Sequence, residues 1–393
     1  FVQAPNVGPF NNDGTYNLRG NQIGYGNNLT GLQFQNAQYL LDKNTYSAQN
    51  DHIISNFYIG LKLAKGLNFK SLYGIDNLIV ENKDFLDALH GDGFADGGSA
   101  TNTMNRYSRK SIQNVLDYNI TLAEEHNLSA LLGSERQYSK IDAWGATRKT
   151  VSDPFFNEYQ GGFSTAIPAG NLLVENYLES YFGRINYDYN RKYYLSVNAR
   201  RDGYSAFAPG NKWGNFYGGS LGWTVSEENF FKNSAIGEVV SQFKLRASYG
   251  VVGNNQGIAS YASSSFYDAG LNGTNPTLFY AQAGNKNLTW ETSKKTDFGL
   301  NFGLFNDRIT GELGYYKNNI DGLILSVPQA TSTGIPNSSI LTNIGSMNNK
   351  GYEVTLNAKI LSEGAFKWNA SVNITTQKNV VTALDANNSD IIV

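Results

Sequence analysis

The fold of this chain is decided by residues 181–200, which read YFGRINYDYNRKYYLSVNAR. In the second half of this stretch the apolar side chains stand at every other position: Tyr193, Leu195, Val197 and Ala199. Polar residues lie between them, and the first half alternates in the same way up to a polar turn at residues 190–192. A period of two is typical of strands with one apolar and one polar face. The stretch therefore predicts a hairpin with an apolar outer face, a charged inner face and tyrosines crowded at its turn.

The rest of the chain repeats this unit. The alternation continues, with interruptions, from about Ile54 to Thr375 and predicts about twelve strands. Turns of about two to four residues alternate with polar loops of about ten to forty, and the longest loops are expected at residues 142–175, 252–290 and 326–349. Residues 227–241 form a further link with a short helical pattern.

Composition agrees with an all-β protein and excludes several classes. The 393 residues carry 16% charged side chains, below the roughly 25% of soluble domains, with 13% aromatic residues and 41 glycines. The absence of cysteine excludes a disulfide scaffold and cysteine-based metal sites, and a net charge of −2 provides no field to attract nucleic acid. No run of about 18 apolar residues predicts a transmembrane helix. These features fit a transmembrane β-barrel, and equally a large secreted β-sandwich or propeller.

The loop lengths favour the barrel. Outer-membrane barrels have short turns at one end and long loops at the other, whereas a sandwich has no reason to place every long loop at one end. A propeller should repeat every 40–50 residues or so, and the chain shows no such self-similarity. In a barrel the polar rows face a wet lumen and the apolar rows face lipid; the polar rows include Arg184, Arg200, Lys244, Arg246, Glu312 and Lys359. We therefore expect an all-β fold, an antiparallel transmembrane β-barrel.

Two segments are expected along the chain. Residues 1–50, rich in Asn, Gly and Gln, predict a loop-rich segment leading into the barrel, and residues 51–393 predict the barrel portion. The chain starts at Phe1 without a signal-peptide pattern and stops at residues 390–393, just after a strong strand. Both ends are interpreted as cuts, so the chain is expected to be an internal part of a longer protein with a larger closed barrel.

Several short motifs then match one family in order over roughly residues 55–380. They are YFGRINY at 181–187, RRDG at 200–203, WG at 213–214, SEE at 226–228 with FF at 230–231, LRASYG at 245–250, NL at 287–288 with WE at 290–291, and NKGYE at 349–353. By these motifs the chain resembles the SusC/RagA-type TonB-dependent outer-membrane transporters.

The resemblance implies a 22-stranded barrel in the bacterial outer membrane, with an N-terminal plug preceded by a TonB-contacting segment. The plug, that segment and the final strands are absent from this chain. It also implies two protein partners, a SusD-like surface lipoprotein that forms a lid and TonB with its inner-membrane motor. The function implied is TonB-dependent import of a bulky nutrient, a glycan or an oligopeptide. Two alternatives stay open: a passive porin-like channel, and a structural barrel that docks other surface proteins.

Four aromatic residues in predicted loops or strand mouths are the candidate substrate-binding residues: Trp144, Tyr204, Phe207 and Trp213. Such rings could stack on a sugar or a peptide, but tyrosine and tryptophan also form girdles at membrane interfaces, and the girdle or loop packing is favoured. Arg201 and Asp202 are expected to form an ion pair at the lumen or rim, and Ser226 is a plausible helix cap.

No catalytic or cofactor site is expected. The three histidines, His52, His90 and His126, are far apart in sequence, and no phosphate-binding loop, dinucleotide motif or nucleophile elbow is present. Residues 91–96, GDGFAD, could hold Ca²⁺ but lack the ligand spacing of a calcium loop, so a flexible loop is predicted. No cofactor is expected in this chain, and a calcium site is considered only for the full protein or its partner. The chain is expected not to be an enzyme.

Overall fold

The computed structural model describes residues 7–19, 22–25, 28–29, 35–153, 155 and 157–384. The chain forms two compact units. The first unit comprises Phe1–Asn56, Gly74–Lys110 and Tyr138–Glu175, and the second comprises Phe57–Tyr73, Ser111–Gln137 and Asn176–Val393. The C-terminal stretch 390–393 lies outside the described residues.

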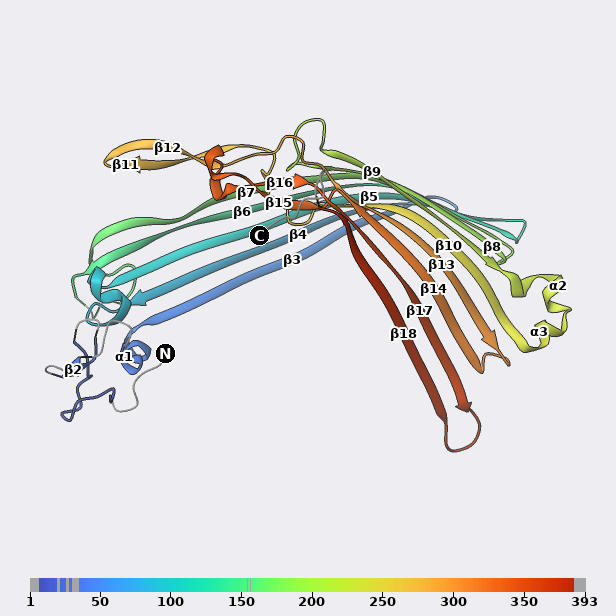
Figure 1. Ribbon diagram of the computed structural model, residues 1–393, viewed down its shortest axis with the longest axis horizontal. Helices are drawn as coiled ribbons and strands as arrows, with labels where there is room; N and C mark the ends of the chain where they lie inside the picture. Colours follow the sequence, from blue (N-terminus) through green and yellow to red (C-terminus); the bar gives the residue numbers. More distant parts are fainter. Residues whose placement is uncertain are drawn as a thin grey trace. The chain divides into compact units, whose positions relative to one another are not determined.

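The main sheet has twelve strands, and their order across the sheet is the same as their order along the chain (Figure 1). The strands are β3 (Thr45–Ala64), β4 (Leu67–Leu86), β5 (Ser99–Leu122), β6 (His126–Val151), β7 (Phe163–Tyr189), β8 (Tyr193–Tyr204), β9 (Trp213–Thr224), β10 (Val240–Asn254), β13 (Glu291–Leu304), β14 (Ile309–Asp321), β17 (Ser346–Leu361) and β18 (Trp368–Ala383). The predicted all-β class and the expected number of strands are confirmed.

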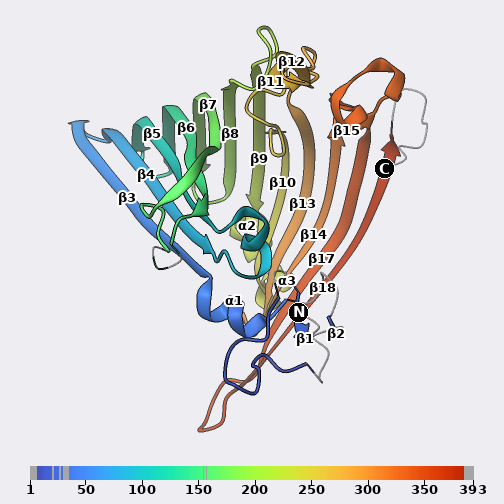
Figure 2. The same ribbon diagram turned by 90° about the vertical axis from the view of Figure 1, so that its left-hand side faces the viewer.

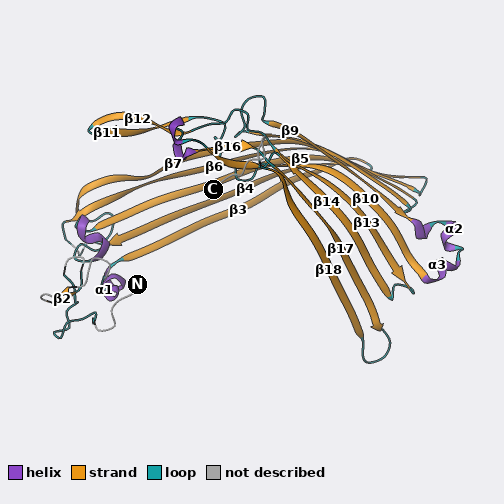
Figure 3. Ribbon diagram, viewed as in Figure 1, coloured by secondary structure: helices purple, strands orange, loops and turns teal. Residues whose placement is uncertain are grey.

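Short elements lie in the connections (Figure 3). Three small hairpin sheets pair β1 (Gly24–Tyr25) with β2 (Asn28–Leu29), β11 (Phe266–Asn272) with β12 (Asn275–Gln282), and β15 (Ile324–Pro328) with β16 (Ser339–Asn343). The helices are α1 (Ala37–Lys43), α2 (Asn229–Lys232) and α3 (Ala235–Val239), with 3₁₀ turns η1 (Gly91–Asp96), η2 (Val225–Glu227), η3 (Thr331–Thr333) and η4 (Pro336–Ser338). Among the described residues, every helix is too short or too polar to cross a bilayer.

In the second unit, the last part of β7 and the strands β8, β9, β10, β13, β14, β17 and β18 run side by side as one curved layer (Figure 2). Their register places apolar residues opposite one another from strand to strand, in the row Tyr187, Leu195, Leu221, Ala247, Phe298, Tyr315 and Tyr352. Leu221 and Tyr352 are each 62% exposed, and Phe298 is 54% exposed. Large apolar side chains with this exposure are not pressed against a second sheet, as expected of a surface that faces lipid.

The opposite face of the same strands is polar. Arg246 of β10 forms an ion pair with Glu312 of β14, and Lys244 lies 4.0 Å from the ring centre of Tyr194 on β8. Because successive residues of a strand point to opposite faces, one sequence row supplies the lipid side and the other the lumen side. The polar rows identified in the sequence therefore share one face of the sheet.

The connections alternate in length along the meander. In the second unit, residues 65–66, 123–125, 190–192, 305–308 and 362–367 join strands at one end, and residues 205–212, 255–290 and 322–345 join them at the other. The connections of the first unit, residues 87–98 and 152–162, are also long. Asn190 and Arg191 have φ angles of 50° and 55°, as tight hairpin turns require. The short-turn end also carries one long connection, residues 225–239 between β9 and β10.

Several predicted loops contain regular structure. Within the predicted loop of residues 1–50, α1 forms and β3 begins at Thr45; β6 and β7 occupy most of residues 142–175; and the hairpins β11–β12 and β15–β16 lie in the remaining two long loops. Residues 91–96, predicted as a flexible loop, form the 3₁₀ turn η1. The strands in the three long loops were not predicted because a strand that is wet on both faces has no apolar row, and the period-two signal then disappears.

Candidate functional site

The long-loop end of the second unit holds its hydrophobic core. Tyr204 at the end of β8 and Phe216 of β9 lie on the polar, lumen-side rows, and the connection 255–290 brings Trp290 against them. The ring centres of Trp290 lie 5.4 Å from those of both Phe207 and Phe216. The cluster is completed by Ala206, Ile258, Ala262 and Leu288. A long connection thus packs against the lumen side of the sheet.

Side-chain amides tie this connection to its neighbours. Asn343 at the end of β16 donates from its amide nitrogen to the carbonyl of Thr289 and accepts from the Thr289 N–H, both at 2.8 Å. Asn285 donates to the carbonyl of Leu341 at 2.8 Å, and Asn211 donates to the carbonyl of Lys286 at 3.0 Å. These side-chain amides pair with backbone groups of neighbouring connections, which need hydrogen-bond partners when they are buried. The three connections 205–212, 255–290 and 322–345 are thereby cross-linked, and we call them the loop platform.

Next to the platform, a charged cluster occupies the same face of β7 and β8. The guanidinium of Arg200 donates to Asp202 at 2.7 Å and to the buried hydroxyl of Ser180 at 2.8 Å. It also lies 3.5 Å from a carboxylate oxygen of Glu135 and over the ring of Phe182. The face at the loop end therefore combines a fixed cation and carboxylates with an aromatic wall.

The expected Arg201–Asp202 ion pair was wrong. Asp202 pairs with Arg200, two residues earlier, while Arg201 lies over the ring of Trp213 at 5.0 Å. Neighbouring residues in a strand point to opposite faces, so Arg201 and Asp202 cannot meet. The spacing i, i+2 is the one that the pleat allows.

Two of the four predicted substrate-binding aromatics are core residues of the platform. Tyr204 is 9% exposed and Phe207 is 1% exposed, and each ring contacts the ring of Trp290. Their surfaces are occupied by protein, so contact with a ligand would require the platform to rearrange.

The other two lie elsewhere. Trp213 stands in register with Gly203 on the outward-facing row and stacks on Tyr181, as a ring of an interfacial girdle would. Trp144 is in β6 of the first unit, inside a strand and not a loop, and is 62% exposed. Within the second unit the structure brings Tyr204 and Phe207 together and places Trp213 on the opposite face.

The histidines have separate structural contacts. His126 bonds through Nδ1 to the hydroxyl of Tyr187 at 2.7 Å, and His52 bonds to Asp76 at 2.7 Å. His90 is buried and accepts from the N–H of Asn36 at 2.8 Å. In the described part of the chain, no three His, Cys, Asp or Glu residues are grouped as metal ligands would be.

The first unit has its own buried polar cluster around α1. The amide oxygen of Asn36 caps the helix by accepting from the N–H of Tyr39, and the Tyr39 hydroxyl donates to Asp87 at 2.6 Å. Burial and then the hydrogen bond to Asp87 raise the pKa of Tyr39 well above its ordinary value, so the hydroxyl remains a donor. In η1, Asp92 accepts from Gln35 while Asp96 pairs with Lys149, so the two acids face different partners.

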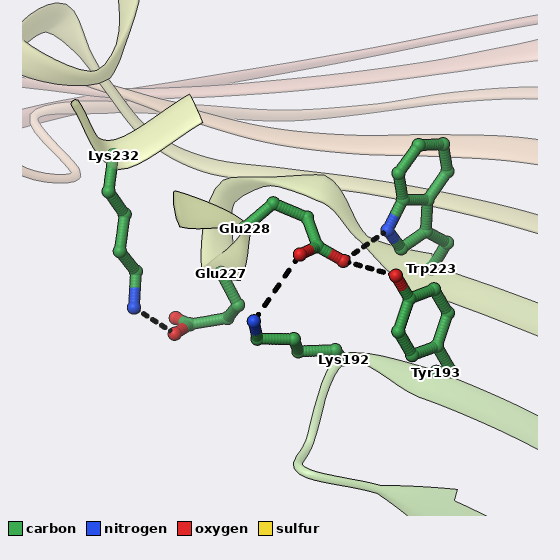
Figure 4. Close-up of polar contacts among 6 residues, drawn as sticks. All are labelled: Lys192, Tyr193, Trp223, Glu227, Glu228 and Lys232. Atoms are coloured by element: carbon green, nitrogen blue, oxygen red, sulfur yellow. Dashed lines mark hydrogen bonds and ion pairs between the residues drawn. The ribbon is translucent and has the colours of Figure 1, made fainter. Parts of the chain in front are cut away.

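At the short-turn end, the connection 225–239 is anchored by Glu228 (Figure 4). Its carboxylate accepts from the hydroxyl of Tyr193 and from the indole N–H of Trp223, and lies 3.3 Å from the ammonium of Lys192. The hydrogen bond from Tyr193 is the main cause that holds the pKa of Glu228 below its usual range, helped by Trp223 and Lys192. Tyr193 and Trp223 are on the apolar outer row and stack on each other, so this cluster has the make-up of an interfacial aromatic girdle.

Ser226 is not a helix cap. It lies within η2, and Glu228 precedes α2 without a side-chain capping bond. Ser234 caps the next helix, α3, by accepting from the N–H of Gly237. The sequence analysis therefore placed a cap in the correct connection but on the wrong serine.

Sequence reasoning missed Trp290, Asn343 and Glu228 as organising residues of the two ends. Trp290-Glu291 and Glu227-Glu228 were noted only as motifs, and nothing in a period-two pattern says that a loop tryptophan folds back onto a strand. Chemically, the arrangement offers polar and aromatic contacts on a wall; the described residues show no nucleophile, base and orienting group held together.

Comparison with known proteins agrees with this architecture. Residues 3–391 match the family described as TonB dependent receptor-like, beta-barrel. TonB-dependent receptor P3 of Formosa agariphila is 33% identical over 391 residues, which are 97% of this chain and 37% of that protein. TonB-dependent receptor SusC of Bacteroides thetaiotaomicron is 33% identical over 68% of this chain and 27% of its own length. The chain thus spans well under half of the length of these relatives.

Among solved structures, the RagAB peptide transporter aligns with a TM-score of 0.80 and 25% identity over 96% of this chain and 41% of that one. The family match, the relatives and the twelve-stranded sheet with one apolar face lead to one conclusion. This chain belongs to the β-barrel family of TonB-dependent receptors of the bacterial outer membrane.

Proposed function

We propose that the full protein imports a bulky nutrient, a glycan or an oligopeptide, across the outer membrane in a TonB-dependent manner. It acts with a SusD-like surface lipoprotein as a lid and with TonB and its inner-membrane motor, and it does no covalent chemistry. The similarity to SusC supports this reading, and the similarity to the RagAB peptide transporter adds peptides as a substrate class.

The observation that carries the proposal is the loop platform. Three long connections are cross-linked by asparagine amides and pack with Trp290 on the lumen-side rows of β8 and β9. Buried loops of this kind narrow the entrance and give a substrate a fixed surface, which a freely open pore does not need. Aromatic and charged groups at the wall, such as Arg200 with Asp202, suit the amide or hydroxyl groups of an oligomer.

The test uses the full-length protein with its lid partner in a strain that depends on it for growth. Deleting the TonB-contacting segment should abolish uptake of a labelled oligopeptide or oligosaccharide while leaving the barrel folded and in the membrane. Unchanged uptake after the deletion would favour the passive channel. Loss of surface assemblies without loss of uptake would favour the docking barrel.

The four aromatic residues keep their place in this proposal as candidates for substrate contact. Of these, Trp144 has the most exposed ring, at 62% against 40% for Trp213, while Tyr204 and Phe207 are covered by the platform. Trp144→Ala should therefore raise the half-saturating substrate concentration without changing the thermal stability of the barrel.

A further inference from the structure

Three lysines stand in register on neighbouring strands of the second unit. Lys317 of β14 lies directly opposite Lys350 of β17, and Lys350 lies directly opposite Lys378 of β18. We call these three residues the lysine row. Side chains that are directly opposite in a sheet have Cβ atoms about 4.5–5.5 Å apart, and like charges in such pairs are destabilising.

The lysine row is on the outward-facing side. Lys317 follows Tyr315 by two residues and Lys350 precedes Tyr352 by two, and these tyrosines are paired with each other in the apolar row. Residues two apart in a strand share a face, so the lysines continue the apolar row towards the long-loop end. All three lysines are exposed.

The lysine row marks one edge of the apolar band. On β17 the outward residues from Tyr352 to Ile360 are all apolar, and Ile360 lies at the short-turn end of the strand. The ten steps along the chain from Lys350 to Ile360 span about 33 Å along a strand, or about 25 Å in height at a tilt of about 40°. That height is the thickness of a barrel's lipid-facing band, so the lysine row lies at the level of lipid headgroups. Because long loops face the cell exterior, the leaflet is the outer one.

The charges of the lysine row are not balanced within the described protein. Nearby on the same face, Asp321 pairs with Lys294 at 2.9 Å. Among the described residues, no carboxylate lies within ion-pair distance of Lys317, Lys350 or Lys378. Two further acids of these strands, Glu312 and Glu353, are on the lumen-side rows. Three adjacent cations at a membrane interface therefore need anions other than those of the described residues.

We propose that the lysine row is a binding site for the phosphate groups of lipid A, the phosphorylated glycolipid of the outer leaflet. Ammonium groups form charge-assisted hydrogen bonds with phosphate oxygens, and their long stems can lie along the apolar surface while the charged heads reach the headgroup plane. Lys294 and Asn319, which are in register with each other beside Asp321, would form the flank of the site. A bound lipid would relieve the repulsion within the lysine row and fix its orientation on β14, β17 and β18.

The experiment uses the full-length protein reconstituted in nanodiscs of phosphatidylethanolamine doped with lipid A. K317Q/K350Q/K378Q should weaken binding of lipid A about tenfold or more, as measured by native mass spectrometry and by titration, because each lysine near a charged lipid surface contributes to the affinity. The arginine triple K317R/K350R/K378R should retain binding, since it keeps the charges.

The matched control is the lumen-side triple K244Q/K295Q/K359Q, which removes the same charge from the opposite face of the sheet and should leave lipid A binding unchanged. Heat-modifiable migration in gels checks that every variant is folded. The proposal is overturned if both triples weaken binding equally, if dephosphorylated lipid A binds as tightly as the phosphorylated form, or if inorganic phosphate alone saturates the site. None of these outcomes depends on nutrient uptake, so the test is independent of the proposed import function.

Discussion

Arg200 and Asp202 face the same side of β8, and the guanidinium Nε donates to the carboxylate Oδ1 at 2.7 Å. The second arm of the guanidinium donates to Ser180, whose hydroxyl is fully buried. One planar side chain thus joins a carboxylate and a hydroxyl on adjacent strands beneath the loop platform. A lysine fits these two partners less well, because it lacks the planar fork whose separate nitrogens reach Asp202 and Ser180 at once.

Arg200→Lys is therefore expected to lower the free energy of unfolding of the full-length protein by about 1–3 kcal/mol, the usual effect of leaving a buried polar partner unpaired. Urea titration of protein refolded in vesicles measures this change. Arg184→Lys, an exposed position on the same face of β7, serves as the control and should change stability by far less. Equal effects of the two substitutions would mean that the Arg200 contacts add little.

An added positive charge should destabilise the barrel on one face of β8 and not on the other. Val197 is in the outward row and 49% exposed, while its neighbour Asn198 is on the lumen side. Val197→Arg should destabilise the barrel by about 2–4 kcal/mol, as arginine does near the bilayer midplane, and Asn198→Arg should have little effect. The yield of folded protein in vesicles and its urea midpoint report both. A larger loss from Asn198→Arg would reverse the assignment of the faces.

Gly253 of β10 lies where a side chain cannot fit. A Cβ at this position would come within 2.1 Å of the ring of Phe216, whereas at Gly250 on the same strand the nearest atom is 3.8 Å away. Gly253→Ala should displace the Phe216 ring from Trp290 and cost about 1–3 kcal/mol, the range for overpacking, with Gly250→Ala near neutral. Proteolysis of the connection 255–290 is the local readout, since a loosened platform exposes it. Equal protease resistance of both variants would contradict this role of the ring.

Phe207→Ala separates structure from binding. Removing a ring that is 1% exposed should leave a cavity beside Trp290 and lower stability by about 3–5 kcal/mol. Trp144→Ala, at a ring that is 62% exposed, should leave stability unchanged. Thermal unfolding and substrate titration of both variants in the full-length protein form the measurement. A stable Phe207→Ala variant with weakened substrate binding would contradict the core role of Phe207 and indicate that its ring contacts the substrate.

Glu228 gives a pH-dependent contribution to stability. Its pKa is lowered in the folded protein, first by the hydroxyl of Tyr193, so its contribution is present above the ordinary pKa range of glutamate and is lost as the pH falls through the folded value. Glu228→Gln should therefore lower the melting temperature at neutral pH, and the difference from wild type should shrink in acid. Glu227→Gln is the control, because Glu227 and its partner Lys232 are both about half exposed. A difference that is constant from neutral to acid pH would rule out ionisation of Glu228 as the cause.

The sequence by itself determined the class of fold, the number of strands, which rows face lipid and which end bears the short turns. This was possible because a strand with one apolar and one wet face has apolar residues at every other position, as Leu195, Val197 and Ala199 show. Where both faces of a strand are wet, as in the hairpin β11–β12, the sequence has no period-two pattern, and a loop was predicted instead of strands.

Only the tertiary structure decided which residues meet. It placed Arg200, and not Arg201, on Asp202; it brought Trp290 onto Phe207 and Phe216 from far along the chain; and it aligned Lys317, Lys350 and Lys378. The physical reason is that contacts between strands depend on register and on where a loop returns, and both are set by pairing between distant segments. The alternation within a strand predicts which face of the sheet a residue is on, but not which residue of the next strand lies opposite it.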